Sequence, residues 1–174
     1  MPKGKKRHKK GSGGTPHRAS KRTPLGSRSL PAIPPIVPFG EVIAEAPVLR
    51  VKIQGAPTVP DGKYSLIDAY CTDPDCDCRK AYIVVRAENT AEDIAYISVG
   101  WESLSFYKNW MKAPRPPGIS LADLKGPSLM PMMPQSSLAK PLLEVLRSYF
   151  EDPEKIGFYK ERYFQFKAHL VERP

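Results

Sequence analysis

Four stretches in the middle of the chain are short, rich in β-branched and aromatic residues, and separated by Gly, Pro, Asn or Asp. Stretches of this kind predict β-strands, and short turns between them favour antiparallel pairing of neighbours. We therefore expect a meander of three to four strands. The predicted strands cover residues 48–53, 64–70, 81–86 and 94–99.

Beyond residue 100 the apolar residues recur at intervals of three and four, which is the period of a helix with one buried face. A short helix is expected over 101–111, and two longer helices end the chain. Ser136 or Ser137 is the expected N-cap of the first, whereas Asp152 followed by Pro153 is a preferred start for the second. The last helix has an apolar face that we expect to pack as core, made of Ile156, Tyr159, Tyr163, Phe166 and Leu170.

The two patterns together predict an α+β fold, in which a small antiparallel β-meander is covered on one face by the C-terminal helices. We expect this domain to cover residues 45–172. Residues 29–44 are rich in proline, which predicts an extended linker or a strap along the domain. Residues 1–28 have no hydrophobic periodicity and are expected to form a disordered basic tail.

Charge is distributed very unevenly along the chain. Of the 27 Lys and Arg residues, ten lie in residues 1–28, which contain no Asp or Glu. Residues 29–174 contain the other 17 and all 18 acidic residues, so this part of the chain is nearly neutral. A flexible polycation binds phosphate backbones without reading bases, so we expect nucleic acid, RNA or the ribosome, as partner. A merely solubilising tail is the alternative. The predicted nucleic-acid-binding residues are Lys3, Lys5, Lys6, Arg7, Lys9, Lys10, Arg18, Lys21 and Arg22.

No apolar run approaches the roughly 20 residues that span a bilayer, and the sequence shows no signal peptide. We therefore expect a soluble, cytoplasmic protein with no membrane partner. A proline-rich loop over 113–134 carries Met130, Met132 and Met133. These methionines either pack over the sheet or mark a surface for a protein partner.

All three cysteines, Cys71, Cys76 and Cys78, fall within eight positions and are separated by Asp, Pro and Thr residues. Thiolates are the ligands that zinc and iron prefer. Cys76 and Cys78 point to the same side of an extended segment, and Pro74 can turn the chain so that Cys71 meets them. We predict a metal knuckle on these three residues, with zinc as the expected metal and iron left open.

The spacing does not identify a fourth ligand. The candidates are Asp73, Asp75, Asp77, His169 or a water molecule, and a water would leave an open site like that of a catalytic centre. Three other interpretations stay open: a disulfide with one cysteine left over, cysteines packed as small apolar residues, and a catalytic thiol activated by nearby cations.

The block Tyr70-Cys71, Asp73-Pro74 and Cys76-Asp77-Cys78-Arg79 resembles that of an uncharacterised bacterial family. Residues 100–110 and 135–139 and the aromatic final helix are also similar, so the resemblance covers roughly residues 60–170. It implies a metal-binding protein, sometimes associated with the SEC-C motif, a small zinc-binding module. It implies no enzymatic activity.

This chain departs from the resemblance at two places. Cys76 and Cys78 match the Cys-x-Cys half of the SEC-C motif, but Ala87 and Glu88 stand where its second ligand pair would fall. Similar proteins have a His before the tyrosine of the final helix, where this chain has Arg162. If that His is a ligand elsewhere, the site here is altered or uses His169.

The expected function is therefore that of a non-enzymatic, zinc-stabilised binding or adaptor protein whose basic arm contacts nucleic acid. The alternative is a metal-dependent hydrolase or a thiol enzyme that uses an open cysteine site. Against the alternative, the sequence contains neither the Glu/His constellation of a metallohydrolase nor a glycine-rich phosphate-binding loop.

Overall fold

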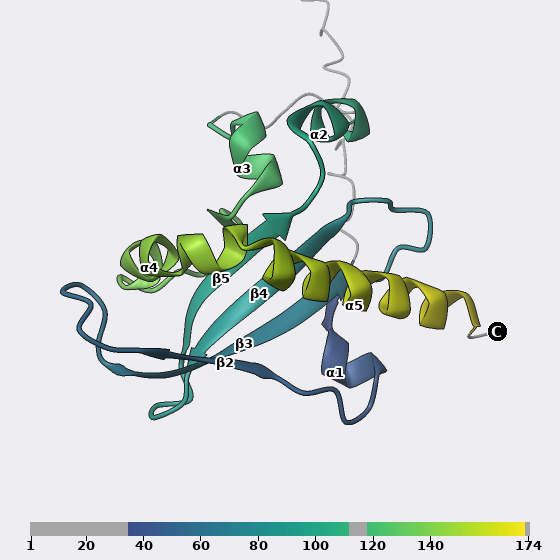
Figure 1. Ribbon diagram of the computed structural model, residues 1–174. Coiled ribbons are helices and arrows are strands. Elements are labelled where there is room, and N and C mark those ends of the chain that lie inside the picture. Colours follow the sequence, from purple (N-terminus) through teal and green to yellow (C-terminus); the bar gives the residue numbers. More distant parts are fainter. Residues whose placement is uncertain (1–34, 112–117, 173–174) are drawn as a thin grey trace, which may run out of the picture. The chain divides into compact units, whose positions relative to one another are not determined.

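The computed structural model describes residues 35–111 and 118–172, and its centre is an antiparallel β-sheet (Figure 1). Six strands form it in the order β1-β3-β4-β5-β6, with β2 also paired to β3. β1 lies beside the last three residues of β3, and β2 lies beside its first five. The strands are β1 (Ile36–Pro38), β2 (Leu49–Ile53), β3 (Gly62–Cys71), β4 (Lys80–Ala87), β5 (Asp93–Gly100) and β6 (Ser128–Leu129).

The three central strands bury one face almost completely. In register, Leu66 pairs with Val85, and Ile83 pairs with Ile97, and none of these side chains is more than 1% exposed. Because side chains alternate along a strand, the residues between them point to the opposite face. That second face is half-buried and includes Ser65, Ile67, Tyr82, Val84 and Tyr96.

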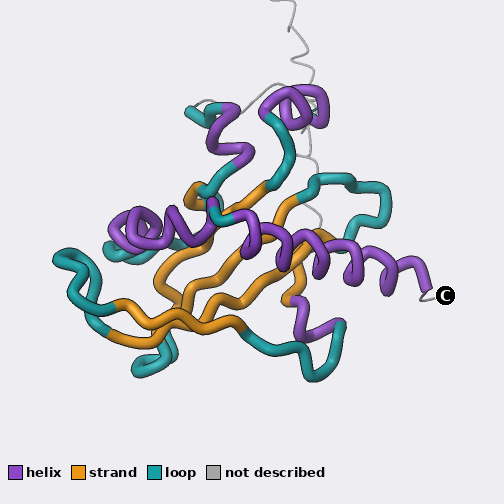
Figure 2. The backbone as a smooth tube through the Cα atoms, viewed as in Figure 1, coloured by secondary structure: helices purple, strands orange, loops and turns teal. Residues whose placement is uncertain are grey.

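Two C-terminal helices pack on the first face, α4 (Ala139–Glu151) and α5 (Pro153–Glu172). Figures 1 and 2 show α5 running across the layer of strands, with α4 beside it near β5. Tyr159, Tyr163 and Phe166 of α5 are each 3% exposed or less, so this stripe is core. The predicted α+β class, with an antiparallel sheet covered by C-terminal helices, is confirmed.

The sequence predicted the N-cap of α5 correctly but not that of α4. Asp152 Oδ1 accepts a hydrogen bond from the Glu154 amide at 2.8 Å, as expected of an N-cap before Pro153. The expected cap at Ser136 or Ser137 was wrong, because α4 begins at Ala139 and its N-cap is Leu138. The Ser136 amide donates instead to the Ile94 carbonyl of β5, which holds this segment to the sheet and delays the helix.

Three short helices complete the described chain: α1 (Phe39–Val42), α2 (Leu104–Trp110) and α3 (Leu121–Lys125). Within the predicted linker or strap 29–44, residues 36–42 form β1 and α1. The predicted loop over 113–134 contains α3 and β6. The predicted basic tail, 1–28, lies outside the described residues. Within the described ranges, no helix combines the length and the apolar side chains that crossing a bilayer requires.

Candidate metal centre

The cysteine segment closes the hairpin between β3 and β4. Cys71 is the last residue of β3, and β4 begins two residues after Cys78. Between them Asp73 turns the chain: its Oδ1 accepts from the Asp75 amide at 2.9 Å, and its carbonyl accepts from the Cys76 amide at 3.2 Å. This side-chain turn brings the segment back toward the end of β3.

The three sulfur atoms converge, as the spacing predicted. The Sγ atoms of Cys71, Cys76 and Cys78 all lie within 4.8 Å of one another. Sulfur ligands of a tetrahedral zinc ion, at about 2.3 Å from the metal, lie about 3.8 Å apart, so a small contraction would complete three bonds. All three are free thiols, of which Cys71 and Cys78 are buried and Cys76 is half-buried. This cluster can hold a metal ion.

No carboxylate or imidazole of the described residues joins the three sulfurs. The Asp73 carboxylate accepts from a backbone amide of the turn, and that of Asp77 accepts from the Arg79 guanidinium at 2.9 Å. Asp75 is exposed. The identity of a fourth ligand therefore stays a prediction.

His169 belongs to a different side of α5 from the residues that contact the cysteine loop. Tyr163 and Lys167 contact the loop, whereas Arg162 contacts Asp68 in β3. An α-helix turns by about 100° per residue, so the seven residues from Arg162 to His169 make nearly two full turns. His169 therefore lies on the same side of α5 as Arg162. Its Nε2 atom is buried and has no hydrogen-bond partner among the described residues.

The three thiols titrate as one group. A hydrogen bond with the Cys78 thiol is the main reason why the pKa of the Cys71 thiol is lowered to about 6. The same hydrogen bond, followed by burial, raises the pKa of Cys78, and burial raises the pKa of Cys76. The cluster thus holds one negative charge readily, and only a bound cation would stabilise two or three.

Two residues of α5 form hydrogen bonds with the cysteine loop. The Lys167 ammonium donates a hydrogen bond to the Asp73 carbonyl, and its charge also helps to lower the pKa of Cys71. The Tyr163 hydroxyl lies 3.4 Å from both the Cys76 carbonyl and the Asp77 carboxylate, to which it donates. The C-terminal helix therefore fixes the loop as well as covering the sheet.

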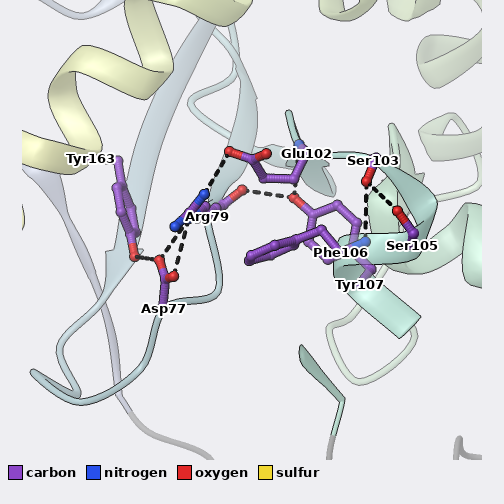
Figure 3. A network of polar contacts seen from close by, with 8 residues as sticks. All are labelled: Asp77, Arg79, Glu102, Ser103, Ser105, Phe106, Tyr107 and Tyr163. Atoms are coloured by element: carbon purple, nitrogen blue, oxygen red, sulfur yellow. Dashed lines mark hydrogen bonds and ion pairs between the residues drawn. The ribbon is translucent and has the colours of Figure 1, made fainter. Parts of the chain in front are cut away.

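Arg79, directly after the last cysteine, ties the other end of the loop to α2 (Figure 3). Its backbone has a φ of 47°, which turns the chain sharply into β4. Its guanidinium donates to Asp77 at 2.9 Å and to Glu102 at 3.1 Å, and lies 4.8 Å from the centre of the Phe106 ring. Its carbonyl accepts from the Tyr107 hydroxyl at 2.9 Å. Figure 3 shows this network between the loop and the start of α2.

Sequence reasoning found the three cysteines whose sulfur atoms converge but missed the groups around them. Tyr163 was recognised only as a member of an apolar stripe, and Lys167 has no signal beyond its position one turn after Tyr163. Glu102 lies 23 residues from Arg79, so nothing local in the sequence connects the two.

Comparisons with protein-family models, with curated proteins and with solved structures gave no match for this chain.

Proposed function

We propose that this protein is a non-enzymatic binding or adaptor protein, whose hairpin is stabilised by a zinc ion on Cys71, Cys76 and Cys78. Its basic N-terminal segment would contact nucleic acid, with RNA or the ribosome as the proposed partner. The observation that carries the metal part is the convergence of three sulfur atoms within 4.8 Å at the end of a buried hairpin.

The surroundings of the cysteines support a structural role for the metal. Two of the three ligands are buried, and the loop that bears them is held by Arg79 on one side and by Tyr163 and Lys167 on the other. Three thiolates around Zn²⁺ carry a net negative charge, which the Lys167 ammonium would offset. The fourth position would be taken by water or by one of the predicted side chains, Asp73, Asp75, Asp77 or His169.

The nucleic-acid part rests on the ten cations and no acids of residues 1–28. Each phosphate contact with a single strand contributes about −0.7 to the slope of log affinity against log salt. Deleting residues 1–28 should therefore weaken RNA binding and flatten this slope by several units. An unchanged affinity and slope would contradict the proposal.

A charge-matched comparison separates the arm from the domain. In one variant Lys5, Lys6, Arg7, Lys9 and Lys10 become Gln, which should reproduce most of the effect of the deletion. In the control variant five exposed lysines of the domain become Gln, and RNA binding should change little. The control positions are Lys52, Lys63, Lys108, Lys140 and Lys160.

A second candidate function uses the open coordination position. Three ligands without a fourth protein group would leave room for a metal-bound water, as in a metal-dependent hydrolase, and the lowered pKa of Cys71 would suit a thiol enzyme. This candidate gains support only if Asp75→Asn or Asp77→Asn abolishes a turnover while the metal stays bound.

A protein partner at the methionine-rich loop remains a separate proposal. Met132 is 79% exposed and Met133 is 37% exposed, so both side chains are accessible. If this loop binds a partner, substituting both methionines with Ser should remove that partner from a pull-down.

A further inference from the structure

The cysteine cluster supplies three donor atoms, and no other side chain of the described residues supplies a fourth. The Sγ atoms of Cys71, Cys76 and Cys78 lie within 4.8 Å of one another, and no described carboxylate or imidazole belongs to the group. Zinc takes four ligands in structural sites, so it needs a donor from outside the cluster. An ion that forms only three bonds to sulfur would be fully coordinated by the cluster itself.

The carboxylates that flank the half-buried Cys76 loop already have partners within it. Asp73 Oδ1 accepts a hydrogen bond from the Asp75 amide at 2.9 Å, which forms the turn. The Asp77 carboxylate accepts from the Arg79 guanidinium at 2.9 and 3.1 Å. Moving either carboxylate to a metal would break contacts that shape and hold the loop. The loop therefore favours coordination by the three sulfur atoms.

Contacts of the protein itself hold the cysteine loop in place. The Thr72 amide and hydroxyl both donate to the Pro35 carbonyl, at 3.0 and 2.9 Å, and so fix the loop to the residue before β1. Cys71 and Cys78 belong to the apolar core and are 4% and 1% exposed. A site that is formed in advance binds an ion at little cost of reorganisation.

Net charge does not decide between ions at this cluster. Lys167 and Lys80 both interact electrostatically with the cysteines, so they can offset the negative charge of a zinc complex with three thiolates. A trivalent ion with three thiolates has no net charge and needs no offset. The number of bonds that an ion forms is therefore the property that distinguishes the candidates.

We propose that the cysteine cluster also binds trivalent arsenic, a soft ion suited to sulfur ligands, in competition with zinc. Arsenous acid, As(OH)3, exchanges its three As–O bonds for three As–S bonds, and each hydroxyl leaves as water with the proton of one thiol. No electron is transferred, so no oxidant or reductant takes part. The arsenic keeps a lone pair where zinc would need its fourth ligand. This inference rests on the proposed metal site, because it uses the same three cysteines.

Native mass spectrometry of the full-length protein, reduced with a phosphine, tests the three bonds. Sodium arsenite is added with a zinc chelator that does not bind arsenous acid, so that any zinc is removed. We expect one arsenic per chain and a mass gain of one arsenic atom less three hydrogen atoms, because all three thiols lose their protons. No bound arsenic, or a complex that retains an As–OH group, would overturn the proposal.

A phenyl-substituted compound of trivalent arsenic, which can form only two bonds to sulfur, is the chemical control. It should displace two hydrogen atoms and leave one of the three thiols free to react with an alkylating reagent, whereas arsenite should leave none. A reactive thiol in the arsenite complex would mean that only two cysteines bind, and would contradict the proposal. Both measurements use the unaltered protein, so neither depends on whether a variant folds.

Substitutions locate the arsenic. Cys71→Ser, Cys76→Ser and Cys78→Ser should each weaken arsenic binding by about 100-fold or more, because the third bond forms within a complex that two bonds already hold. Asp75→Asn is the control and should leave the affinity unchanged, since Asp75 is exposed and arsenic needs no carboxylate. Equal effects of the Ser and Asn substitutions would show that the three sulfurs are not the ligands.

The zinc content of the same preparation separates this inference from the proposed function. Protein that holds zinc but binds no arsenic would overturn the inference and leave the structural zinc site in place. Protein that is purified without zinc but binds arsenic through three sulfurs would support the inference and contradict the zinc part of the proposed function.

Discussion

The Arg162 guanidinium of α5 lies 2.7 Å from the Asp68 carboxylate of β3, and both side chains are less than a tenth exposed. The Tyr70 hydroxyl donates to the same carboxylate at 2.9 Å, and Arg162 also donates to the Pro47 carbonyl at 2.6 Å. Burial is the main reason why the pKa of Asp68 is raised, and Arg162 and Tyr70 counteract it. This pair fixes the long C-terminal helix to the sheet at one register.

Arg162→Met should lower the free energy of unfolding by about 3–5 kcal/mol, because it leaves the Asp68 carboxylate buried without its counter-ion. Urea denaturation measures the change. Replacing both partners, Asp68→Leu with Arg162→Met, should recover much of the loss. Arg147→Met is the control, since its exposed pairs with Glu144 and Glu151 are worth about 1 kcal/mol or less.

The same variant tests the position of Arg162 relative to the cysteines. Arg162 contacts Asp68 and Pro47 and not the cysteine loop. Arg162→Met should therefore leave the metal content of folded protein unchanged. Loss of metal from a protein that remains folded would show that α5 contributes to the site at this position.

Arg79→Met should weaken zinc binding by about tenfold, because the loop loses its ties to Asp77 and Glu102 and its contact with Phe106. Competition with a chromophoric chelator measures the affinity. Arg86→Met is the control: it breaks an ion pair of 2.7 Å with Asp93 near the end of β4 that is far from Arg79. Equal effects of the two substitutions would contradict a role for Arg79 in positioning the loop.

Zinc binding should release protons. At pH 7 the Cys71 thiol, whose pKa is lowered to about 6, is mostly ionised, whereas Cys76 and Cys78, whose pKa values are raised, are protonated. Forming three thiolate bonds therefore releases about two protons, so affinity should fall about 100-fold for each unit that the pH is lowered near 7.

Calorimetry in buffers of different ionisation enthalpy counts these protons. The expected count is about two at pH 7 and about three at pH 5, since Cys71 is then protonated as well. A count near zero at both values would mean that the thiols are not the ligands.

The sequence predicted those parts of the fold that have a regular period. The four strands β2 to β5 and the stripe from Ile156 to Leu170 carry periods of two and of three to four, and the strands were predicted close to their true ends. β1 and β6, with three and two residues, are too short to show a period. Their pairing depends on β3 and β5, which lie far away in the sequence.

For the candidate site too, the sequence predicted the local features and missed the long-range contacts. The three cysteines share one short segment, so spacing alone predicted that their sulfurs meet. Lys80 is a cation next to the cysteines in the sequence, yet it is buried among residues that come from five other elements, β1, β5, β6, α3 and α4. Long-range contacts of that kind leave no pattern in the sequence around Lys80.

The measurement that tests the account most directly is the metal content of protein purified under reducing conditions, by native mass spectrometry with elemental analysis, followed by thermal unfolding with and without a chelator. We predict one zinc ion per chain and a large drop in the unfolding temperature on chelation, with loss of the ion in Cys71→Ser, Cys76→Ser and Cys78→Ser. Protein that is folded, free of metal, and has three titratable thiols would contradict the account.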